Sequence, residues 1–331
     1  MGDSPSDFSI VLPVQNEARN IAPMAAALKS IMAKLGSVEI IFVDDGSSDG
    51  TLATLRAAAA DPAIRYVSFT RNFGHQAALR AGLHHVRGRA VVIMDADFEH
   101  PPELIPELIA AWRSGAKVVV TQRIDDGPKI SAVKRFTSKL YYRLLNAIGD
   151  VNIAPGSSDY MLIDRCVVDF INRLEDQDIF LRGLVRWFGF PMTTVPFTRG
   201  KRRGGDSKFA VRQMVELAIT GIAAHSVQPL RLTVYLSLAF AMFGLLLLVY
   251  SVGSLVFYKV VTGWTSLLSA IAILGAAQLL VLGIIGEYVA RILRDIRKRP
   301  SYIVAETEGE RRANSGEPNG IRQTSFATTD V

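Results

Sequence analysis

The stretch Val43-Asp44-Asp45-Gly46-Ser47 is the most informative part of the sequence. The residues before it, 38–43, predict a strand, and residues 44–49 predict a turn. Two adjacent carboxylates, Asp44 and Asp45, therefore fall where a strand ends. Acidic residues at the end of a buried strand are typical of a binding site on a sheet edge rather than of a core.

Strands and helices alternate on both sides of this stretch. Strands are predicted for Phe8–Val14 and for residues 65–69, 90–94 and 117–121, and helices for residues 20–35, 51–60, 76–86 and 101–114. This order predicts an α/β fold with a doubly wound, mostly parallel sheet. In such sheets ligands bind beyond the carboxyl ends of the strands.

The alternation stops after Thr121. Residues 129–146 have the pattern of a basic amphipathic helix, residues 156–163 are expected to return to the sheet, and residues 176–188 predict a helix before a last strand, Met192–Phe197. Residues 209–227 have helical spacing and moderate apolarity, which is typical of an amphipathic helix that lies in a membrane interface.

Two stretches without a charged side chain follow, at residues 232–258 and 264–286. Each is long enough to cross a hydrocarbon core of about 30 Å as a helix. The loop between them holds one charge, Lys259, whereas Arg231 precedes them and a basic cluster follows over residues 291–299. Because basic residues favour the cytoplasmic side, we expect an integral, multi-pass protein of the inner or plasma membrane with a cytoplasmic catalytic domain.

The chain of 331 residues thus divides into four regions. Residues 1–198 form the α/β domain, 199–231 a basic loop and juxtamembrane helix, 232–290 two transmembrane helices, and 291–331 a basic segment that is expected to be disordered from about Ala305. The chain has a net charge of +6, and basic residues flank the apolar spans, which favours contact with lipid headgroups. Basic residues do not interleave with aromatic ones as in nucleic-acid-binding proteins, so no nucleic acid partner is expected, and homo-oligomerisation is left open.

A second acidic motif, Asp95-Ala96-Asp97, also follows an apolar strand. Two carboxylates at positions i and i+2 of a turn are able to share one hard divalent cation, Mg²⁺ or Mn²⁺, and such a cation neutralises a diphosphate leaving group. Taken alone, each acidic motif is equally compatible with a solvated turn. Their placement at neighbouring strand ends, with Pro13, Asn16 and Glu17 at the end of the first strand, favours a binding site.

Neither a dinucleotide-binding nor a P-loop glycine motif is present. The basic stretch at residues 199–208 is compatible with a solvated loop near the membrane or with a phosphate clamp, in which arginine forks bind phosphate oxygens. The five histidines, His75, His84, His85, His100 and His225, do not form a ligand pattern, and we interpret them as surface or internally bonded side chains.

In their order along the chain, these motifs resemble the family 2 glycosyltransferases of the GT-A fold. The resemblance rests on residues 9–17, 43–51, 71–74, 95–97 and 101–103. Further features narrow the resemblance to the polyprenyl-phosphate glycosyltransferases, the GtrB-like and dolichyl-phosphate-mannose-synthase-like group. These features are residues 156–160 and 180–183, the basic stretch and the two apolar spans. Two places depart from that pattern: Phe98-Glu99-His100, where relatives often carry Leu-Gln-Asp, and Ser157-Ser158 before Asp159.

The resemblance implies a role for each matching residue. Asp95 and Asp97 would hold Mg²⁺ or Mn²⁺, Asp97 would thereby act in catalysis, and Asp159 would lie near the sugar and the acceptor phosphate, where the family's usual candidate base is found. The nucleotide would contact Pro13, Glu17, Asp44 and Asp45. Phosphate of the lipid or the donor would be bound by Arg199, Arg202, Ser207 and Lys208.

The implied reaction is an inverting, metal-dependent transfer of a sugar from a nucleotide-sugar, a UDP-sugar, to undecaprenyl or dolichyl phosphate at the cytoplasmic face. A phosphate monoester has a second pKa near ~6 and needs little deprotonation, so Asp159 is left as either a base or a positioning residue. Another lipid or glycan acceptor is the alternative reaction. A non-catalytic nucleotide-binding subunit is a further alternative, but it predicts loss of the acidic motifs, which are all present.

Overall fold

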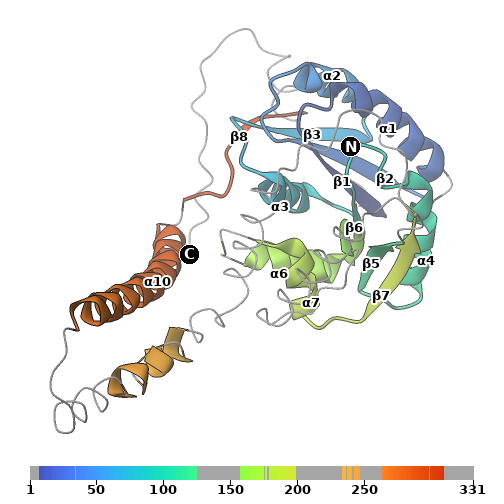
Figure 1. The fold of residues 1–331 in the computed structure, drawn as a ribbon. Coiled ribbons are helices and arrows are strands. Elements are labelled where there is room, and N and C mark those ends of the chain that lie inside the picture. Colours follow the sequence, from blue (N-terminus) through green and yellow to red (C-terminus); the bar gives the residue numbers. More distant parts are fainter. Residues whose placement is uncertain are drawn as a thin grey trace.

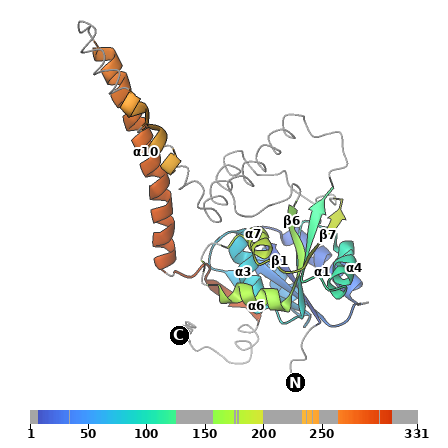
Figure 2. The ribbon, with the colours of Figure 1, turned by 90° about the horizontal axis from the view of Figure 1, so that it is seen from below.

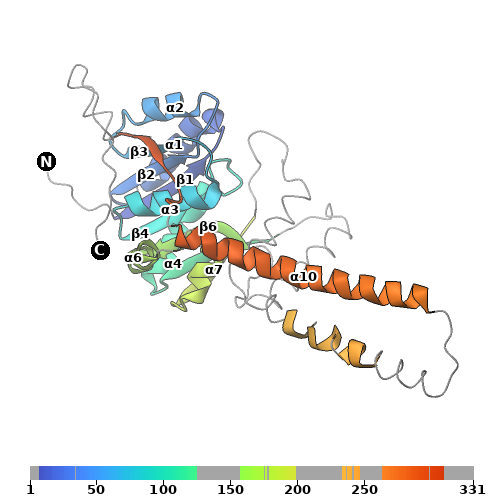
Figure 3. The same ribbon diagram turned by 90° about the vertical axis from the view of Figure 1, so that its left-hand side faces the viewer.

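The computed structural model describes residues 7–33, 35–124, 157–174, 176, 179–198, 233–235, 237–240, 242–246, 263–297 and 299–308. They form a layered α/β unit, from which one long helix, α10 (Trp264–Ile296), projects away (Figures 1 and 3). The predicted helices at residues 129–146 and 209–227 lie outside the described residues.

The central sheet has eight strands in the order β7-β5-β6-β4-β1-β2-β3-β8. Neighbours pair in parallel at β1–β2, β1–β4, β2–β3 and β5–β7, and antiparallel at β4–β6, β5–β6 and β3–β8. The predicted α/β, mostly parallel sheet is therefore confirmed, with β6 and β8 as the antiparallel members. The strands are β1 (Phe8–Val14), β2 (Val38–Asp44), β3 (Ile64–Phe69), β4 (Ala90–Ile93), β5 (Val118–Arg123), β6 (Ser157–Asp164), β7 (Met192–Phe197) and β8 (Val304–Thr307).

Helices cover both faces of the sheet. One core contains Leu12 of β1 together with side chains of α1 (Ala18–Met32), α2 (Thr51–Ala58) and α4 (Ile105–Arg113). The other contains Val11 of β1 with side chains of α3 (His75–His85), α6 (Arg165–Arg173) and α7 (Leu181–Trp187). Since neighbouring residues of a strand point to opposite faces, β1 is buried on both sides, as a central parallel strand should be.

The helices differ from the sequence-based assignments in two places. No element was assigned to Arg165–Arg173, where α6 forms and begins with Asp164 accepting a hydrogen bond from the amide of Cys166 (3.0 Å). The helix expected over residues 176–188 begins only at Leu181. Residues 101–114 are helical as predicted but start as a 3₁₀ turn, Pro102–Leu104, because prolines suit a first helical turn.

The expectation of disorder from about Ala305 is wrong for the first residues of that segment. Val304–Thr307 forms β8 and extends the sheet beyond β3 (Figure 1). Glu306 pairs with Arg56, and Glu308 accepts from Arg65 Nε (2.7 Å). The polar composition suggested a solvated tail, but these charges are partners of arginines that lie about 250 residues earlier in the chain.

In the part of the chain that the structure describes, one helix is long and apolar enough to cross a membrane by length and composition, at Ile273–Ala290 within α10. Thr233–Leu246 is a shorter apolar helix, and much of the first predicted span lies outside the described residues. Large apolar side chains of α10 are exposed, Leu279 and Ile296 at 70% each. Figure 2 shows this helix leading away from the layered unit.

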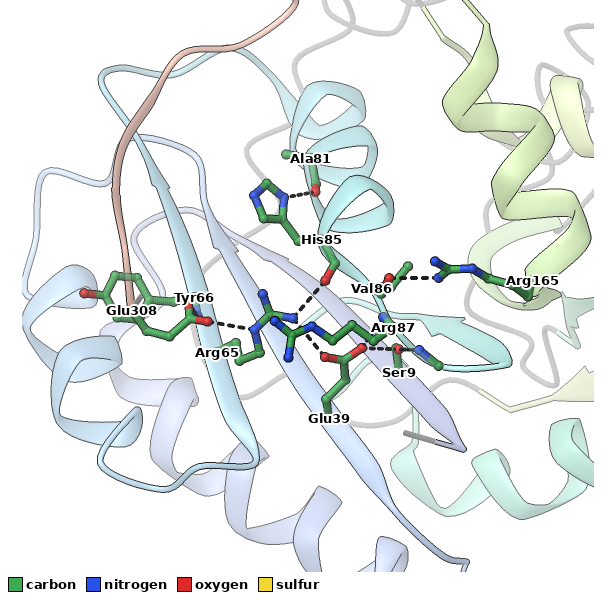
Figure 4. A network of polar contacts seen from close by, with 11 residues as sticks. Ser9, Glu39, Arg65, Tyr66, Ala81, His85, Val86, Arg87, Arg165 and Glu308 are labelled. Atoms are coloured by element: carbon green, nitrogen blue, oxygen red, sulfur yellow. Dashed lines mark hydrogen bonds and ion pairs between the residues drawn. The ribbon is translucent and has the colours of Figure 1, made fainter. Parts of the chain in front are cut away.

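A buried polar network closes the amino ends of the parallel strands (Figure 4). Its centre is Glu39 of β2, which is 5% exposed. Glu39 accepts hydrogen bonds from Ser9 Oγ of β1 (2.5 Å) and from Arg65 Nη1 of β3 (3.0 Å). Arg65 Nη1 also donates to the carbonyl oxygen of His85 at the end of α3 (2.8 Å).

Candidate active site

Those predicted site residues that the structure describes gather at the opposite, carboxyl edge of the strands. Asp44 is the last residue of β2 and lies in register with Val14 of β1 and Ser68 of β3. Asp95 follows β4, and Asp159 lies near the start of β6, which runs antiparallel to β4. The strand order therefore brings together carboxylates that are more than 100 residues apart in the sequence.

Asp44 is 1% exposed, and both of its carboxylate oxygens accept hydrogen bonds. Ser68 Oγ donates to Oδ2 (2.8 Å) and the amide of Ser47 donates to Oδ1 (3.1 Å). Asp44 thus fixes the turn after β2 against β3. The hydrogen bonds described for Asp44 therefore hold neighbouring parts of the fold together.

Asp45 holds the next loop. It accepts hydrogen bonds from the amides of Phe73 (2.6 Å) and Gly74 (3.0 Å), which lie just before α3. Burial and the neighbouring charge of Asp44 raise the pKa of Asp45 despite those two amides. Gly46 has a φ of 63°, and a Cβ there would lie 2.3 Å from the carbonyl carbon of Arg71, so the two loops pack too closely for any other residue.

The loop after β1 is tied to the same turn. The side-chain oxygen of Asn16, whose φ is 57°, accepts from the amide of Ser48 (2.9 Å), and the amide of Glu17 donates to Thr51 Oγ1 (2.9 Å). Asn20 Nδ2 donates to the Glu17 carboxylate (2.5 Å). Pro13 is buried within β1, in register with Val43. Glu17 therefore lies at the predicted edge, and Pro13 lies within the sheet beside it.

The Asp95-Ala96-Asp97 motif forms a tight turn. Asp97 Oδ1 accepts from the amide of Glu99 (2.9 Å), and Phe98 between them has a φ of 65°, a conformation that is strained for an aromatic residue. Burial, together with the charges of Asp95 and Glu99, raises the pKa of Asp97. The turn thus concentrates negative charge in a partly buried place.

His100 connects this turn to β6. The amide of Asp95 donates to its Nδ1 (3.0 Å), so in the neutral ring Nε2 carries the hydrogen and donates to Ser158 Oγ (2.6 Å). The ring stacks on Tyr160 with centroids 5.0 Å apart. The interpretation of His100 as an internally bonded histidine is confirmed. The two departures from the family pattern, at His100 and at Ser158, are therefore direct partners.

Asp159 is 7% exposed and lies between the side chains of Arg182 and His75. Arg182, in the first turn of α7, forms a bidentate pair with it, Nη2 to Oδ2 being 2.7 Å, and His75 Nε2 lies 3.4 Å from Oδ2. Burial opposes the charge of Asp159, but Arg182 and His75 outweigh it and hold its pKa well below the ordinary value. Such a carboxylate is a poor proton acceptor, so the geometry favours a positioning role over a base.

His75 was predicted from the sequence to be a surface or internally bonded histidine, and the structure places it in the site beside Asp159. Loss of solvation opposes its charge, but the carboxylates of Asp159 and Asp95 raise its pKa. It is the first residue of α3, directly after the Gly74 that Asp45 binds. Arg182 belonged to a motif of the family resemblance but was given no role, because its partner Asp159 is 23 residues away and no local pattern joins them.

The residues of the acidic turn fit a hard divalent cation. Asp95 and Asp97 supply carboxylate oxygens, which Mg²⁺ and Mn²⁺ prefer, and burial together with the neighbouring acids raises the pKa of Asp97. Among the described residues no group of three or more His, Cys, Asp or Glu side chains is arranged to enclose a metal. Arg199, Arg202, Ser207 and Lys208 lie outside the described residues.

Comparison with known proteins identifies the family of the chain. The family model of glycosyl transferase family 2 matches residues 9–171, and that of the GtrB C-terminal hairpin matches residues 228–292. The glycosyltransferase YkcC of Bacillus subtilis is 37% identical over 91% of this chain and 94% of its own length. A prophage-derived bactoprenol glucosyl transferase of Shigella flexneri is 37% identical over 91% and 98%, and the bactoprenol glucosyl transferase of Shigella phage SfV is 38% identical over 90% and 97%.

Among solved structures, glucosyl-3-phosphoglycerate synthase from Mycobacterium tuberculosis superposes with a TM-score of 0.45 and 21% identity, covering 66% of this chain and 78% of that one. A similarity of this size says nothing about substrates. The sequence relatives, in contrast, are similar over nearly their full length, through the acidic edge and the hairpin alike. The chain belongs to glycosyltransferase family 2 and is a glycosyltransferase with a GtrB C-terminal hairpin.

Proposed function

We propose that this enzyme transfers glucose from UDP-glucose to a polyprenyl phosphate, undecaprenyl phosphate in a bacterial membrane. The observation that carries the proposal is the near full-length similarity to relatives named bactoprenol glucosyl transferases, which includes the hairpin segment. An acceptor that is carried in the membrane is consistent with an exposed apolar helix in the same chain as the α/β domain that holds the site.

The transfer is a single displacement. An oxygen of the lipid phosphate attacks the anomeric carbon, the bond from that carbon to the diphosphate oxygen breaks, and UDP leaves with the electron pair, so the anomeric centre is inverted. The lipid phosphate is largely ionised at neutral pH, and no base is needed to remove a proton from it. This agrees with a permanently charged Asp159 that orients Arg182 and His75 toward the reacting phosphates.

Asp95 and Asp97 would hold Mg²⁺ or Mn²⁺, which when bound neutralises the diphosphate as its charge grows. Around this ion, side chains of the protein position the nucleotide-sugar donor. Asp45 and Asp44 fix the loops next to the nucleotide, and His75, whose pKa is raised by Asp159 and Asp95, lies at the start of α3. Electrostatic stabilisation of this kind is often the largest catalytic contribution. Arg199, Arg202, Ser207 and Lys208 are proposed to bind phosphate from the segment before the hairpin.

The sheet also supports a two-span topology. Strands β1–β7 precede the hairpin and β8 follows it, yet all belong to one sheet. Both flanks of the hairpin therefore lie on the same side, and if α10 crosses the membrane a second crossing has to precede it. Together with the basic flank at residues 291–299, this supports a cytoplasmic site domain.

The test uses the full chain in proteoliposomes with undecaprenyl phosphate and radiolabelled UDP-glucose. We expect label in the chloroform-soluble lipid, released by mild acid, and none after EDTA treatment until Mn²⁺ or Mg²⁺ is restored. UDP-galactose, UDP-N-acetylglucosamine and GDP-mannose are run in parallel. Transfer only to a different lipid or to a glycan, or full activity in EDTA, would contradict the proposal.

A further inference from the structure

The chain returns to the sheet after its membrane helix. We call residues 299–308 the C-terminal strap. Within it, β8 pairs antiparallel with β3, and the amide of Thr70 donates to the carbonyl oxygen of Ile303 (3.1 Å). Ion pairs fix its end, Glu306 to Arg56 and Glu308 to Arg65. Figure 1 shows the strap running from the end of α10 to the edge of the sheet beside β3.

The connection between the membrane helix and the sheet is short. α10 ends at Ile296 and β8 begins at Val304. The seven residues between them span at most about 25 Å even when fully extended. The strap therefore limits how far the β3 edge of the sheet is able to move from the end of the helix.

Tyr302, in this connection, packs against Phe69, which borders the loop that Asp45 holds. Its ring stacks on Phe69, the last residue of β3, with centroids 5.0 Å apart and planes 15° apart. Phe69 in turn meets Phe73 edge to face at 5.7 Å. The amide of Phe73 donates to Asp45 (2.6 Å). Three aromatic rings thus lead from the strap to a carboxylate of the proposed donor site.

A hydrogen bond fixes the orientation of the Tyr302 ring. Its hydroxyl lies 2.7 Å from Nδ1 of His84, in the last turn of α3. Burial lowers the pKa of His84 to about 4, so the imidazole is neutral and shares one hydrogen bond with the Tyr302 hydroxyl. Tyr302 therefore contacts the loop before α3 through Phe69 and the end of α3 through His84.

We propose that Tyr302 is a positioning residue that couples the membrane anchor to the Phe73–Asp45 contact and so raises the affinity for the nucleotide-diphosphate donor. The inference rests on the proposed donor site at Asp45. It gives the strap a function beyond anchoring: the donor site is fully ordered only when the chain after the membrane helix is docked on β3.

The test compares three full-length variants with the wild type. Tyr302→Leu keeps apolar bulk but removes the stacked ring and the hydroxyl, Tyr302→Phe keeps the ring, and Ile303→Ala is the matched control, since Ile303 is 49% exposed and bonds through its backbone. Hydrogen exchange, followed by mass spectrometry without substrate, should be faster at residues 69–75 in Tyr302→Leu. It should be near wild type in the other two. Unchanged exchange in Tyr302→Leu overturns the proposal whether or not the proposed reaction is correct.

Kinetics supply the second readout. We expect the donor KM of Tyr302→Leu to rise about fivefold, the size of one lost aromatic contact, with kcat and the acceptor KM near wild type. Tyr302→Phe should recover most of this loss. An unchanged donor KM, or an equal effect of Ile303→Ala, overturns the positioning role. If the wild type transfers no glucose to lipid, the proposed function fails, while the exchange measurement still decides the coupling.

Discussion

The two edges of the parallel strands carry buried acids in different electrostatic states. At the amino edge, Glu39 and Glu308 both bind Arg65. Burial opposes the charge of Arg65, but these two partners outweigh it and raise its pKa. At the carboxyl edge, the pKa of Asp97 is raised by burial and by the acids beside it. At one edge a shared arginine binds the acids, and at the other burial and neighbouring acids oppose the charge of Asp97.

This difference separates scaffold from site. A buried acid with a bidentate or shared arginine is satisfied and stabilises the fold only as long as both partners stay. An acid with a raised pKa in a partly buried turn is a candidate for binding a cation, because the ion supplies the missing charge. Asp159 lies at the carboxyl edge but resembles the acids of the amino edge, since it is paired with an arginine, Arg182, and also contacts His75.

The largest effect on activity is expected for Asp97→Asn. Removing this carboxylate should lower glucosyl transfer by at least about 100-fold, because the diphosphate loses its counter-ion, while the thermal midpoint stays the same or rises. A raised pKa means that the charge of Asp97 costs stability, which the amide does not. Transfer assays and thermal melts of the same preparation measure both. Wild-type activity in this variant would remove Asp97 from the site.

For Glu39→Ala we expect the opposite outcome, a loss of stability with little loss of activity. Breaking a buried, paired charge costs about 3–5 kcal/mol, so the thermal midpoint should fall clearly. Activity per folded molecule should remain near wild type at low temperature, because Glu39 lies at the far edge of the sheet. Melting curves and active-site-normalised rates test this. Strong loss of activity with an unchanged midpoint would show that the two edges are not functionally separate.

Arg182→Lys tests whether Asp159 acts through its bidentate pair. Lysine keeps the charge but loses the planar fork, so we expect about a 10-fold loss in kcat, the size of one charged hydrogen bond. Arg173→Lys, at the exposed end of α6, serves as the charge-conserving control. If both variants match the wild type, the Asp159–Arg182 pair is only structural.

The smallest effect concerns pH and His75. Its folded pKa is raised, so the stabilisation it gives is present below the unfolded pKa and is lost as the pH rises through the folded one. Relative to the wild type, His75→Gln should therefore lower the thermal midpoint at pH 6, by about 2 °C, and less at pH 9. A larger deficit at pH 9 than at pH 6 would contradict a charged His75 beside Asp159.

The sequence predicted what depends on local pattern. The strand ends that carry Asp44, Asp45, Asp95 and Asp97 follow from apolar runs that stop at acids, and β1 and β7 have the predicted bounds. The antiparallel β8 was missed because its pairing with β3 joins residues about 240 positions apart. His75 was missed for the same reason: its partner Asp159 comes from another strand, and a histidine after a glycine has no pattern of its own.

The comparison of the two edges is tested most directly by titrating Mn²⁺ into the purified full chain, with UDP present, and following the free ion by electron paramagnetic resonance. We predict one tight site in the wild type, which Asp97→Asn abolishes and Glu39→Gln, at the amino edge, leaves unchanged. Retention of the site in Asp97→Asn, or its loss in folded Glu39→Gln, would contradict the assignment of the carboxyl edge as the place where cation and diphosphate bind.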